Sequence, residues 1–330
     1  MRYRRFGRTG LQVSEIAFGG GRTGGILIDA DDDTRRKAVR RALDLGVNWF
    51  DTAAQYGQGK SEEALGWLLA EIDDKPYVST KVMIDGNNRR DIAGQVARSL
   101  EASLKRLKRG SVDLLQLHNH IESEIGPDAR GRAVTVEDVL GPGGAAEGME
   151  RARDQGLVRF IGLSALGDAA ATVTAIDSGR FDSAQVYYNL INPSAARAMP
   201  PAWHGFQSGG VVAACRRHDM AVLAIRIFAA RYLATTVPTG REGVLTADTD
   251  PASEARMAAA VAAALGTAYG SLAQTAVRFA LSNQDVSTAV VGLARVDHIE
   301  EACAAAAMGP LPPTAFATLE RLYRTGFAAG

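Results

Sequence analysis

The sequence predicts an α/β protein built on a closed (β/α)8 barrel of the TIM type, with an N-terminal β-hairpin cap and long loops at the C-terminal rim. Eight short apolar runs recur along its 330 residues, most of them separated by amphipathic stretches. Strands that alternate with helices form right-handed crossovers and hence a parallel sheet. Eight such units over this length fit a closed barrel better than an open sheet. No linker interrupts the pattern, so we expect residues 1–330 to form a single domain.

The first expected element is the hairpin. The opening RYRRFGRTGLQVSE, with Gly7 and Gly10, predicts a turn between two short strands that caps the bottom of the barrel. The barrel strands are expected near residues 15–19, 47–51, 77–82, 112–118, 159–164, 183–188, 221–227 and 288–292.

Helices are expected between these strands. Acidic residues at 31–33 precede an amphipathic stretch, and acidic groups favour a helix N-terminus. A second helical face is formed by apolar residues at intervals of four and three, namely Ile92, Val96, Leu100, Leu104 and Leu107. Glycines suited to the left-handed residue that ends a helix before a strand are Gly46, Gly110, Gly156 and Gly179. Two irregular stretches, 120–144 and 192–210, are expected to be long functional loops.

The composition excludes several classes of protein. Lys and Arg total 37, as do Asp and Glu, and this balance argues against a nucleic-acid or anionic-membrane partner. No window approaches the apolar length of a membrane span, and the arginine-rich start is not followed by an adequate signal-peptide core. The two cysteines, Cys215 and Cys303, form no Cys-x-x-Cys motif. We therefore expect a reduced, cytoplasmic protein.

FGGGRTGG contains the G-x-G-x-x-G pattern of dinucleotide-binding sites, at Gly19, Gly21 and Gly24. That fingerprint needs a helix at the third glycine. The following ILIDADDD is not expected to begin a helix for several residues, which disfavours a Rossmann site.

AQYGQGKSEE resembles part of a phosphate-binding P-loop, but Ala54 stands where the first glycine belongs. Glu62 and Glu63 would also repel a polyphosphate. We interpret Lys60 as a solvated loop residue and Ser61 as a helix N-cap.

His118 and His120 have a spacing that could hold a metal ion. No other His or Cys lies at a recognisable ligand interval. We therefore predict no metal site.

Four polar residues carry the functional prediction. Asp51 and Tyr56 lie in DTAAQYG, Lys81 in VSTKV and His118 in LLQLHNH, each at or just past the C-terminal end of an expected strand. Active sites of parallel α/β folds lie at these ends. Alone, each residue could be a cap, an ion-pair partner or a packing residue, but together they suggest a proton donor and the groups that tune it for carbonyl reduction.

These motifs resemble the aldo-keto reductase family of nicotinamide-dependent (β/α)8 reductases. The resemblance runs from GRTGLQVSEIAFG through DTAAQYG, STKV, DLLQLH, RFIGLS and QVYYN to VVGLARVDHIEEA. It implies that Tyr56 is the general acid, that Asp51 pairs with Lys81, and that His118 orients the substrate carbonyl. Because a free phenol has a pKa of about 10, we expect the Lys81 ammonium to lower the pKa of Tyr56.

The resemblance also implies residues that contact the cofactor. Ser164 and Gln185 match positions that hold the nicotinamide carboxamide, and Glu301 matches the acidic residue near adenine. The stacking aromatic of the family is replaced by Ile225, so an aliphatic face or Phe228 must substitute. The full set of expected cofactor residues is Gly20, Ser164, Gln185, Arg226, Gly292, Arg295, His298 and Glu301. We predict NADP(H) rather than NAD(H), because Arg295 offers a charge-assisted partner for the 2′-phosphate.

The substrate is expected to be a small carbonyl or sugar-like molecule. The irregular loops 21–30, 120–144, 192–210 and 229–250 would form the substrate walls, with four possible lining residues, Trp203, His204, Phe206 and Phe228. Two other functions stay open: a nucleotide-binding regulatory or redox-sensing barrel, and a cofactor-free hydrolase or isomerase. The sequence does not indicate an oligomeric state.

Overall fold

Eight parallel strands close into a barrel in a computed structural model that describes residues 1–126, 131–235 and 250–328. The strands follow one another around the barrel in the order β10-β11-β12-β3-β4-β5-β6-β9. Their bounds are β3 (Ile16–Gly19), β4 (Trp49–Asp51), β5 (Tyr77–Val82), β6 (Val112–Leu117), β9 (Val158–Ala165), β10 (Ser183–Tyr187), β11 (Ala221–Ile225) and β12 (Val286–Gly292). The predicted fold class and all eight predicted strands are confirmed.

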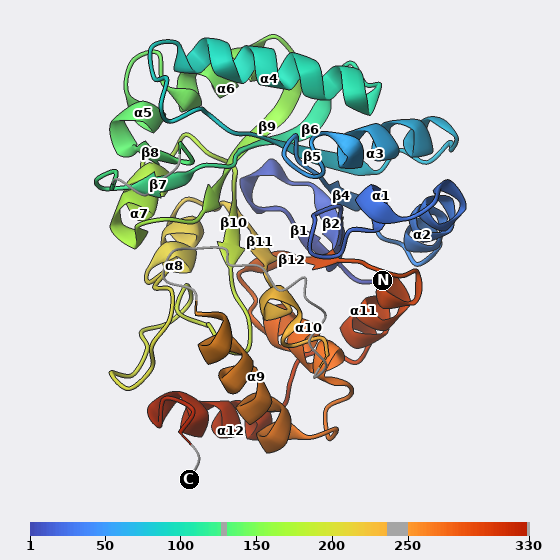
Figure 1. The fold of residues 1–330 in the computed structure, drawn as a ribbon, viewed down its shortest axis with the longest axis vertical. Coiled ribbons are helices and arrows are strands. Elements are labelled where there is room, and N and C mark those ends of the chain that lie inside the picture. Colours follow the sequence, from blue (N-terminus) through green and yellow to red (C-terminus); the bar gives the residue numbers. More distant parts are fainter. Residues whose placement is uncertain (127–130, 236–249, 329–330) are drawn as a thin grey trace.

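Helices surround the strands, and α9 and α12 lie together at one end of the molecule (Figure 1). The helices are α1 (Ile26–Asp29), α2 (Asp32–Asp44), α3 (Lys60–Ala70), α4 (Ile92–Leu107), α5 (Val136–Leu140), α6 (Ala145–Asp154), α7 (Ala169–Asp177), α8 (Val211–Arg217), α9 (Pro251–Leu265), α10 (Leu272–Ser282), α11 (Asp297–Ala307) and α12 (Pro313–Arg324). The predicted acidic start of α2 is confirmed, since Asp31 caps it by accepting the backbone N–H of Thr34. No helix in the described part of the chain is long and apolar enough to cross a bilayer.

The predicted hairpin is formed by β1 (Tyr3–Arg5) and β2 (Gln12–Ser14), which pair antiparallel. Phe6, between them, stacks on Trp49 with ring centroids 4.5 Å apart. Trp49 is the first residue of β4, so this contact lies at the N-terminal end of the barrel. The hairpin therefore closes the bottom and leaves the C-terminal rim for function.

Arg4 of the hairpin contacts the segment that leads into the last barrel strand, β12. Its guanidinium donates to Glu15 at 2.8 Å and to three backbone carbonyls near the end of α10, those of Leu281, Asn283 and Val286. Strand β3 follows the hairpin directly and pairs with β12, the last strand. Arg4 thus reinforces the seam at which the barrel closes.

The stretch 120–144 is more ordered than predicted. It contains β7 (His120–Glu122) and β8 (Ala133–Thr135), which pair in parallel, followed by α5. Thr135 and Asp138 form a capping box that starts α5. Asn119 supports the segment by bonding the backbone of Ile84. The stretch 192–210 contains no helix or strand, as expected.

Three local predictions were wrong. Lys108, rather than Gly110, adopts the left-handed conformation that ends α4, with φ of 52°. Helix α3 begins at Lys60 with Gly59 as its cap, so Lys60 is not a loop residue and Ser61 is not a cap. ILIDADDD begins the short helix α1 at once, because the backbone N–H of Ile26 is bound by the carbonyl of Leu293.

Gly66 lets α3 approach α4 closely. A Cβ at this position would lie 2.4 Å from the carbonyl oxygen of Arg106 and 2.8 Å from the carbonyl carbon of Leu107. We therefore expect Gly66→Ala to lower the free energy of unfolding by about 1–3 kcal/mol, measured by denaturant unfolding. Gly110→Ala is the matched control, since nothing lies within 4 Å of its Cβ position. Equal stability of both variants would contradict the close packing.

Candidate active site

The four predicted catalytic residues lie together at the C-terminal rim. Asp51 ends β4, Lys81 lies near the end of β5, and His118 directly follows β6. Tyr56 lies in the turn between β4 and α3. The strand ends therefore bring residues from three consecutive strands and one connecting turn to one place.

Lys81 is the centre of this group. Its side chain is fully buried, and its Nζ donates to Asp51 Oδ2 at 2.6 Å, to the carbonyl of Thr52 at 2.8 Å and to Tyr56 Oη at 3.2 Å. These three acceptors match the three N–H groups of an ammonium. Lys81 therefore links the buried carboxylate to the phenol.

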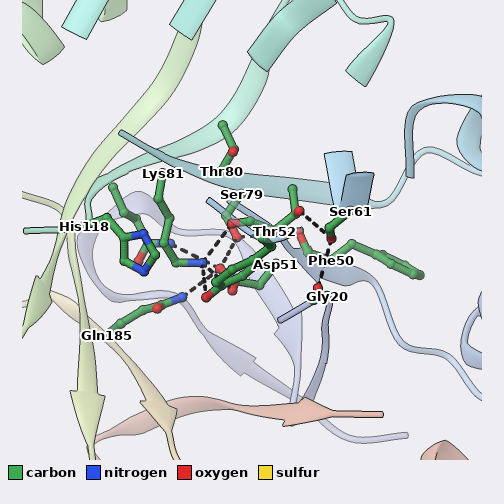
Figure 2. Close-up of polar contacts among 12 residues, drawn as sticks. Gly20, Phe50, Asp51, Thr52, Ser61, Ser79, Thr80, Lys81, His118 and Gln185 are labelled. Atoms are coloured by element: carbon green, nitrogen blue, oxygen red, sulfur yellow. Dashed lines mark hydrogen bonds and ion pairs between the residues drawn. The ribbon is translucent and has the colours of Figure 1, made fainter. Parts of the chain in front are cut away.

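The second carboxylate oxygen of Asp51 is also fixed by hydrogen bonds. Its Oδ1 accepts hydrogen bonds from Ser79 Oγ at 2.8 Å, Gln185 Nε2 at 2.7 Å and Gln116 Nε2 at 3.3 Å. Ser79 in turn accepts from the indole N–H of Trp49 at 3.0 Å. Figure 2 shows Lys81, Ser79 and Gln185 converging on Asp51. The carboxylate cannot turn without breaking several buried hydrogen bonds.

The pKa of Tyr56 differs from the prediction. Burial raises the pKa of the phenol, and this effect outweighs the downward pull of the Lys81 charge, so the net shift is upward. For Lys81, burial alone lowers the pKa, but Asp51 and Tyr56 together outweigh burial and raise it. Near neutral pH the site therefore holds a protonated phenol beside a charged ammonium.

His118 is a neutral member of the group. Burial and then the charge of Lys81 hold its pKa well below the ordinary value. The imidazole meets the ring of Tyr56 edge-on with centroids 5.7 Å apart, and its Nδ1 lies 3.2 Å from Gln55 Oε1. Both side chains thus face the same small region of the rim.

A cavity of about 590 Å³ opens beside this group. The cavity extends from β4 past β9 and β11 to α11, since residues of all four elements line it. The predicted residues that line it are Asp51, Tyr56, His118, Ser164, Gln185, Arg226, Gly292, Arg295, His298 and Glu301. Lys81 lies behind this wall. Gly20 also lies behind it, against Ser61, whose hydroxyl donates to its carbonyl at 3.0 Å.

One end of the cavity suits a nicotinamide. Ser164 Oγ is buried there and has no hydrogen-bond partner among the described residues. Gln185 donates a hydrogen bond from Nε2 to Asp51, so its amide oxygen is the atom that can accept a hydrogen bond from a ligand. An unsatisfied hydroxyl beside an amide acceptor fits a carboxamide, which both donates and accepts. Ile225 and Phe228, the two predicted substitutes of the stacking aromatic, both line the cavity.

The other end carries several charges. Arg295 donates twice to Asp297, at 2.9 and 2.8 Å, a pairing absent from our prediction. Glu301 accepts from the Ser271 hydroxyl at 2.5 Å. Burial and then Arg295 lower the pKa of His298, which makes this imidazole a neutral group.

Only part of the predicted substrate wall lies at the cavity. Phe228 lines it, whereas Trp203, His204 and Phe206 do not. Trp203 is buried and donates to the carbonyl of Ile191 at 3.0 Å, and Phe206 stacks on Tyr187. These two are packing residues of the 192–210 stretch, and His204 is exposed. Most of 229–250 lies outside the described residues.

Several residues around the site escaped the sequence analysis. Ser79 and Gln116 lie two residues before Lys81 and His118, and alternate strand residues share a face. This alternation could have identified Ser79 and Gln116 as neighbours of the predicted catalytic residues. Arg22 and Arg231 also line the cavity. They lie in the stretches 21–30 and 229–250 that the sequence analysis expected to form substrate walls, but neither arginine was singled out there. In residues 1–126, 131–235 and 250–328, no group of three or more His, Cys, Asp or Glu is placed to hold a metal ion.

Comparisons with known proteins agree with this architecture. A solved aldo-keto reductase from Bacillus halodurans, in its holo form, superposes with a TM-score of 0.73 and 20% identity, covering 98% of this chain and 97% of that chain. This similarity concerns the fold.

Sequence relatives extend the comparison. L-galactose dehydrogenase of Arabidopsis thaliana is 27% identical over 310 residues, or 92% of this chain and 87% of the relative. Aldo-keto reductase YhdN of Bacillus subtilis (strain 168) is 33% identical over 171 residues, and the match spans only 50% of this chain and 47% of that relative. The model of the Aldo/keto reductase family matches residues 15–324. The chain therefore belongs to the aldo/keto reductase family.

Proposed function

We propose that this protein is a nicotinamide-nucleotide-dependent oxidoreductase that reduces an aldehyde or ketone, or oxidises a sugar-like alcohol or hemiacetal. The observation that carries the proposal is the contact of 3.2 Å between Lys81 Nζ and Tyr56 Oη, at the edge of a cavity that His118 also lines. A phenol held beside a buried ammonium is suited to give a proton to a carbonyl oxygen and to take it back in the reverse direction.

The cofactor, when bound, would supply or accept the hydride at the carbonyl carbon. Ser164 and Gln185 would hold its carboxamide. Tyr56 would then protonate the carbonyl oxygen as negative charge develops there, and Lys81 would stabilise the phenolate that remains. Asp51 keeps Lys81 in place through the contact of 2.6 Å.

His118 would orient the substrate by donating from Nε2 to the carbonyl oxygen. A neutral imidazole carries one N–H, so donation from Nε2 requires Nδ1 to accept a hydrogen bond. Gln55 Oε1 lies 3.2 Å from Nδ1, and a half-turn of this amide would present its N–H₂ group to Nδ1 and leave the imidazole proton on Nε2.

The first test is consumption of NADPH and NADH, followed by absorbance, with a panel of aldehydes. The panel also includes free sugars with the oxidised nucleotides, because a relative that aligns over most of the chain is named for L-galactose. Turnover that depends on Tyr56 supports the proposal. Saturable nucleotide binding without turnover on any substrate favours the regulatory alternative, and no nucleotide binding favours the cofactor-free one.

NADP(H) remains the predicted preference, and Arg295 is its test. Both Arg295 and Asp297 are exposed, so their ion pair is weak and a 2′-phosphate can displace the carboxylate. Arg295→Ala is expected to weaken NADPH binding about tenfold or more and NADH binding little, measured by titration of each nucleotide. Asp297→Asn is the matched control and should strengthen NADPH binding. Equal losses for both nucleotides in Arg295→Ala would assign the phosphate to another residue.

A further inference from the structure

The first turn of α3 contains a buried hydroxyl that has no assigned part in the proposed proton transfer. Ser61 is the second residue of this helix, and its side chain is fully buried. Because Gly59 is the N-cap, the hydroxyl does not serve the usual role of a serine at a helix start. It is bound instead to two residues beside the active site, Gly20 and Thr52 (Figure 2).

The direction of these two hydrogen bonds follows from the number of protons. A hydroxyl has one proton to donate. Ser61 Oγ donates it to the carbonyl of Gly20 at 3.0 Å, so Thr52 Oγ1 is the donor in the contact of 2.8 Å between the two hydroxyls. The bonds therefore run from Thr52 through Ser61 to Gly20, and loss of the Ser61 hydroxyl would break both of them.

Thr52 is also one of the three acceptors of the Lys81 ammonium. Its carbonyl oxygen lies 2.8 Å from Lys81 Nζ, and its backbone N–H donates to the carbonyl of Ser79 at 2.9 Å. Thr52 thus binds Ser61 through its side chain and Lys81 through its backbone. A bond at the hydroxyl therefore limits the movement of the carbonyl that faces the ammonium.

Ser61 also fixes the turn that carries Tyr56. Its backbone N–H donates to the carbonyl of Tyr56 at 3.3 Å and closes the turn between β4 and α3. On the other side of the phenol, a Cβ at Gly21 would lie 3.5 Å from Tyr56 Cζ, so the backbone at Gly21 lies close to the ring. Gly21 directly follows the carbonyl that Ser61 binds. Ser61 is therefore bonded to the residue that carries the proton donor and next to the residue that covers its ring.

The next residue of α3 is bonded to β5. Glu62 is fully buried, accepts a hydrogen bond from the Thr80 hydroxyl at 2.5 Å and pairs with Arg106 at 2.7 Å. Thr80 directly precedes Lys81, and its side chain lies on the opposite face of the strand. The first turn of α3 is therefore bonded to the ends of both β4 and β5, the strands that bring the buried ion pair together.

We propose that Ser61 is a positioning residue, whose hydroxyl fixes Thr52 so that the Thr52 carbonyl holds the Lys81 ammonium beside the Tyr56 phenol. This inference rests on the proposed function and deepens it. Lysine has a flexible four-carbon stem, so its ammonium keeps one place only while its acceptors keep theirs. Ser61 does not line the cavity. We therefore expect its loss to change the rate of the chemical step and not the binding of ligands.

The test is nucleotide oxidation in a single turnover, which reports on the chemical step without product release. Ser61→Ala should lower the maximal rate about tenfold to a hundredfold. The aldehyde concentration that gives half of this rate should stay unchanged, as should nucleotide affinity measured by titration. A merely structural role would lower stability and leave the rate of the folded protein at the wild-type value.

Ser14→Ala is the matched control. Ser14 is also fully buried, and its hydroxyl donates to the carbonyl of Ile16 at 2.6 Å and accepts from the backbone N–H of Asn48 at 3.1 Å. It lies in the hairpin at the other end of the barrel. Denaturant unfolding should show similar losses of stability for Ser14→Ala and Ser61→Ala, while only Ser61→Ala should be slow.

Thr52→Val breaks the same chain of bonds from its other end and serves if Ser61→Ala fails to fold. Valine has nearly the shape of threonine, and the carbonyl that binds Lys81 remains. The rate should fall as in Ser61→Ala, and Ser61→Ala/Thr52→Val should be no slower than either single variant, because both substitutions remove one shared interaction. Losses that add in the double variant would contradict the proposed chain.

The inference and the proposed function fail in different ways. If wild-type turnover depends on Tyr56 but Ser61→Ala keeps the wild-type rate, the positioning role is refuted and the proposed function stands. Weaker ligand binding at an unchanged rate in Ser61→Ala would refute the positioning role as well. A wild-type protein that turns over no substrate would refute both.

Discussion

Tyr56→Phe is expected to lower kcat by about a hundredfold to ten-thousandfold while nucleotide affinity stays close to that of the wild type. The substitution removes one oxygen, the atom that lies 3.2 Å from Lys81 Nζ. The ring remains, and so does its edge-on contact with His118. Only the proton donor is lost.

The measurement is steady-state turnover together with a separate nucleotide titration. Tyr3→Phe is the matched control, because the Tyr3 hydroxyl donates to the carbonyl of Gly46 at 2.9 Å in the hairpin region, far from the rim. Its turnover should equal that of the wild type. Turnover of Tyr56→Phe within a few-fold of wild type would remove Tyr56 from its proposed role.

Lys81→Met is expected to cost about 3–5 kcal/mol of unfolding free energy as well as turnover. The substitution leaves Asp51, which is 3% exposed, without the ammonium that lies 2.6 Å from it. A charge left alone in such a place is far more costly than the intact pair is favourable.

The double variant Asp51→Asn/Lys81→Met separates the two effects. With neither charge buried, most of the stability should return, while turnover should stay low because nothing remains to stabilise the phenolate. Denaturant unfolding and turnover are measured on the same samples. A double variant as unstable as the single one would show that packing, rather than the lost counter-charge, causes the destabilisation.

The pair also makes a prediction about pH. The pKa of Lys81 is raised in the folded state, so its contribution is fully present below the unfolded value of about 10.4 and is lost only as pH rises through the folded value. The stability difference between wild type and Lys81→Met should therefore be the same at neutral and at mildly alkaline pH. A difference that disappears near neutrality would contradict a charged Lys81.

The sequence was most informative where strands end. Each barrel strand is a short apolar run with a flanking helix, so periodicity alone predicted the barrel, and the position of Asp51, Lys81 and His118 at strand ends predicted their meeting. The direction of the Tyr56 pKa shift could not be predicted, because it depends on how completely the folded rim buries the phenol.

Contacts between segments that are distant in the sequence could also not be predicted. Glu254 meets Arg226 only because α9 packs beside the end of β11, and no spacing in the sequence indicates this. The Arg295–Asp297 pair is local, yet Asp297 could equally have been a simple helix-start residue. Rotamers and loop paths decide such contacts, and neither follows from composition or period.

The seam between β3 and β12 has a consequence for biosynthesis. Ile16 pairs with Ala289, so the first barrel strand emerges from the ribosome long before its neighbour exists. Until then β3 presents an open edge, and such edges invite pairing with other chains. Arg4 likewise finds its carbonyl partners at residues 281–286 only when synthesis is nearly complete. The barrel therefore cannot close until the last strand, β12, has been synthesised.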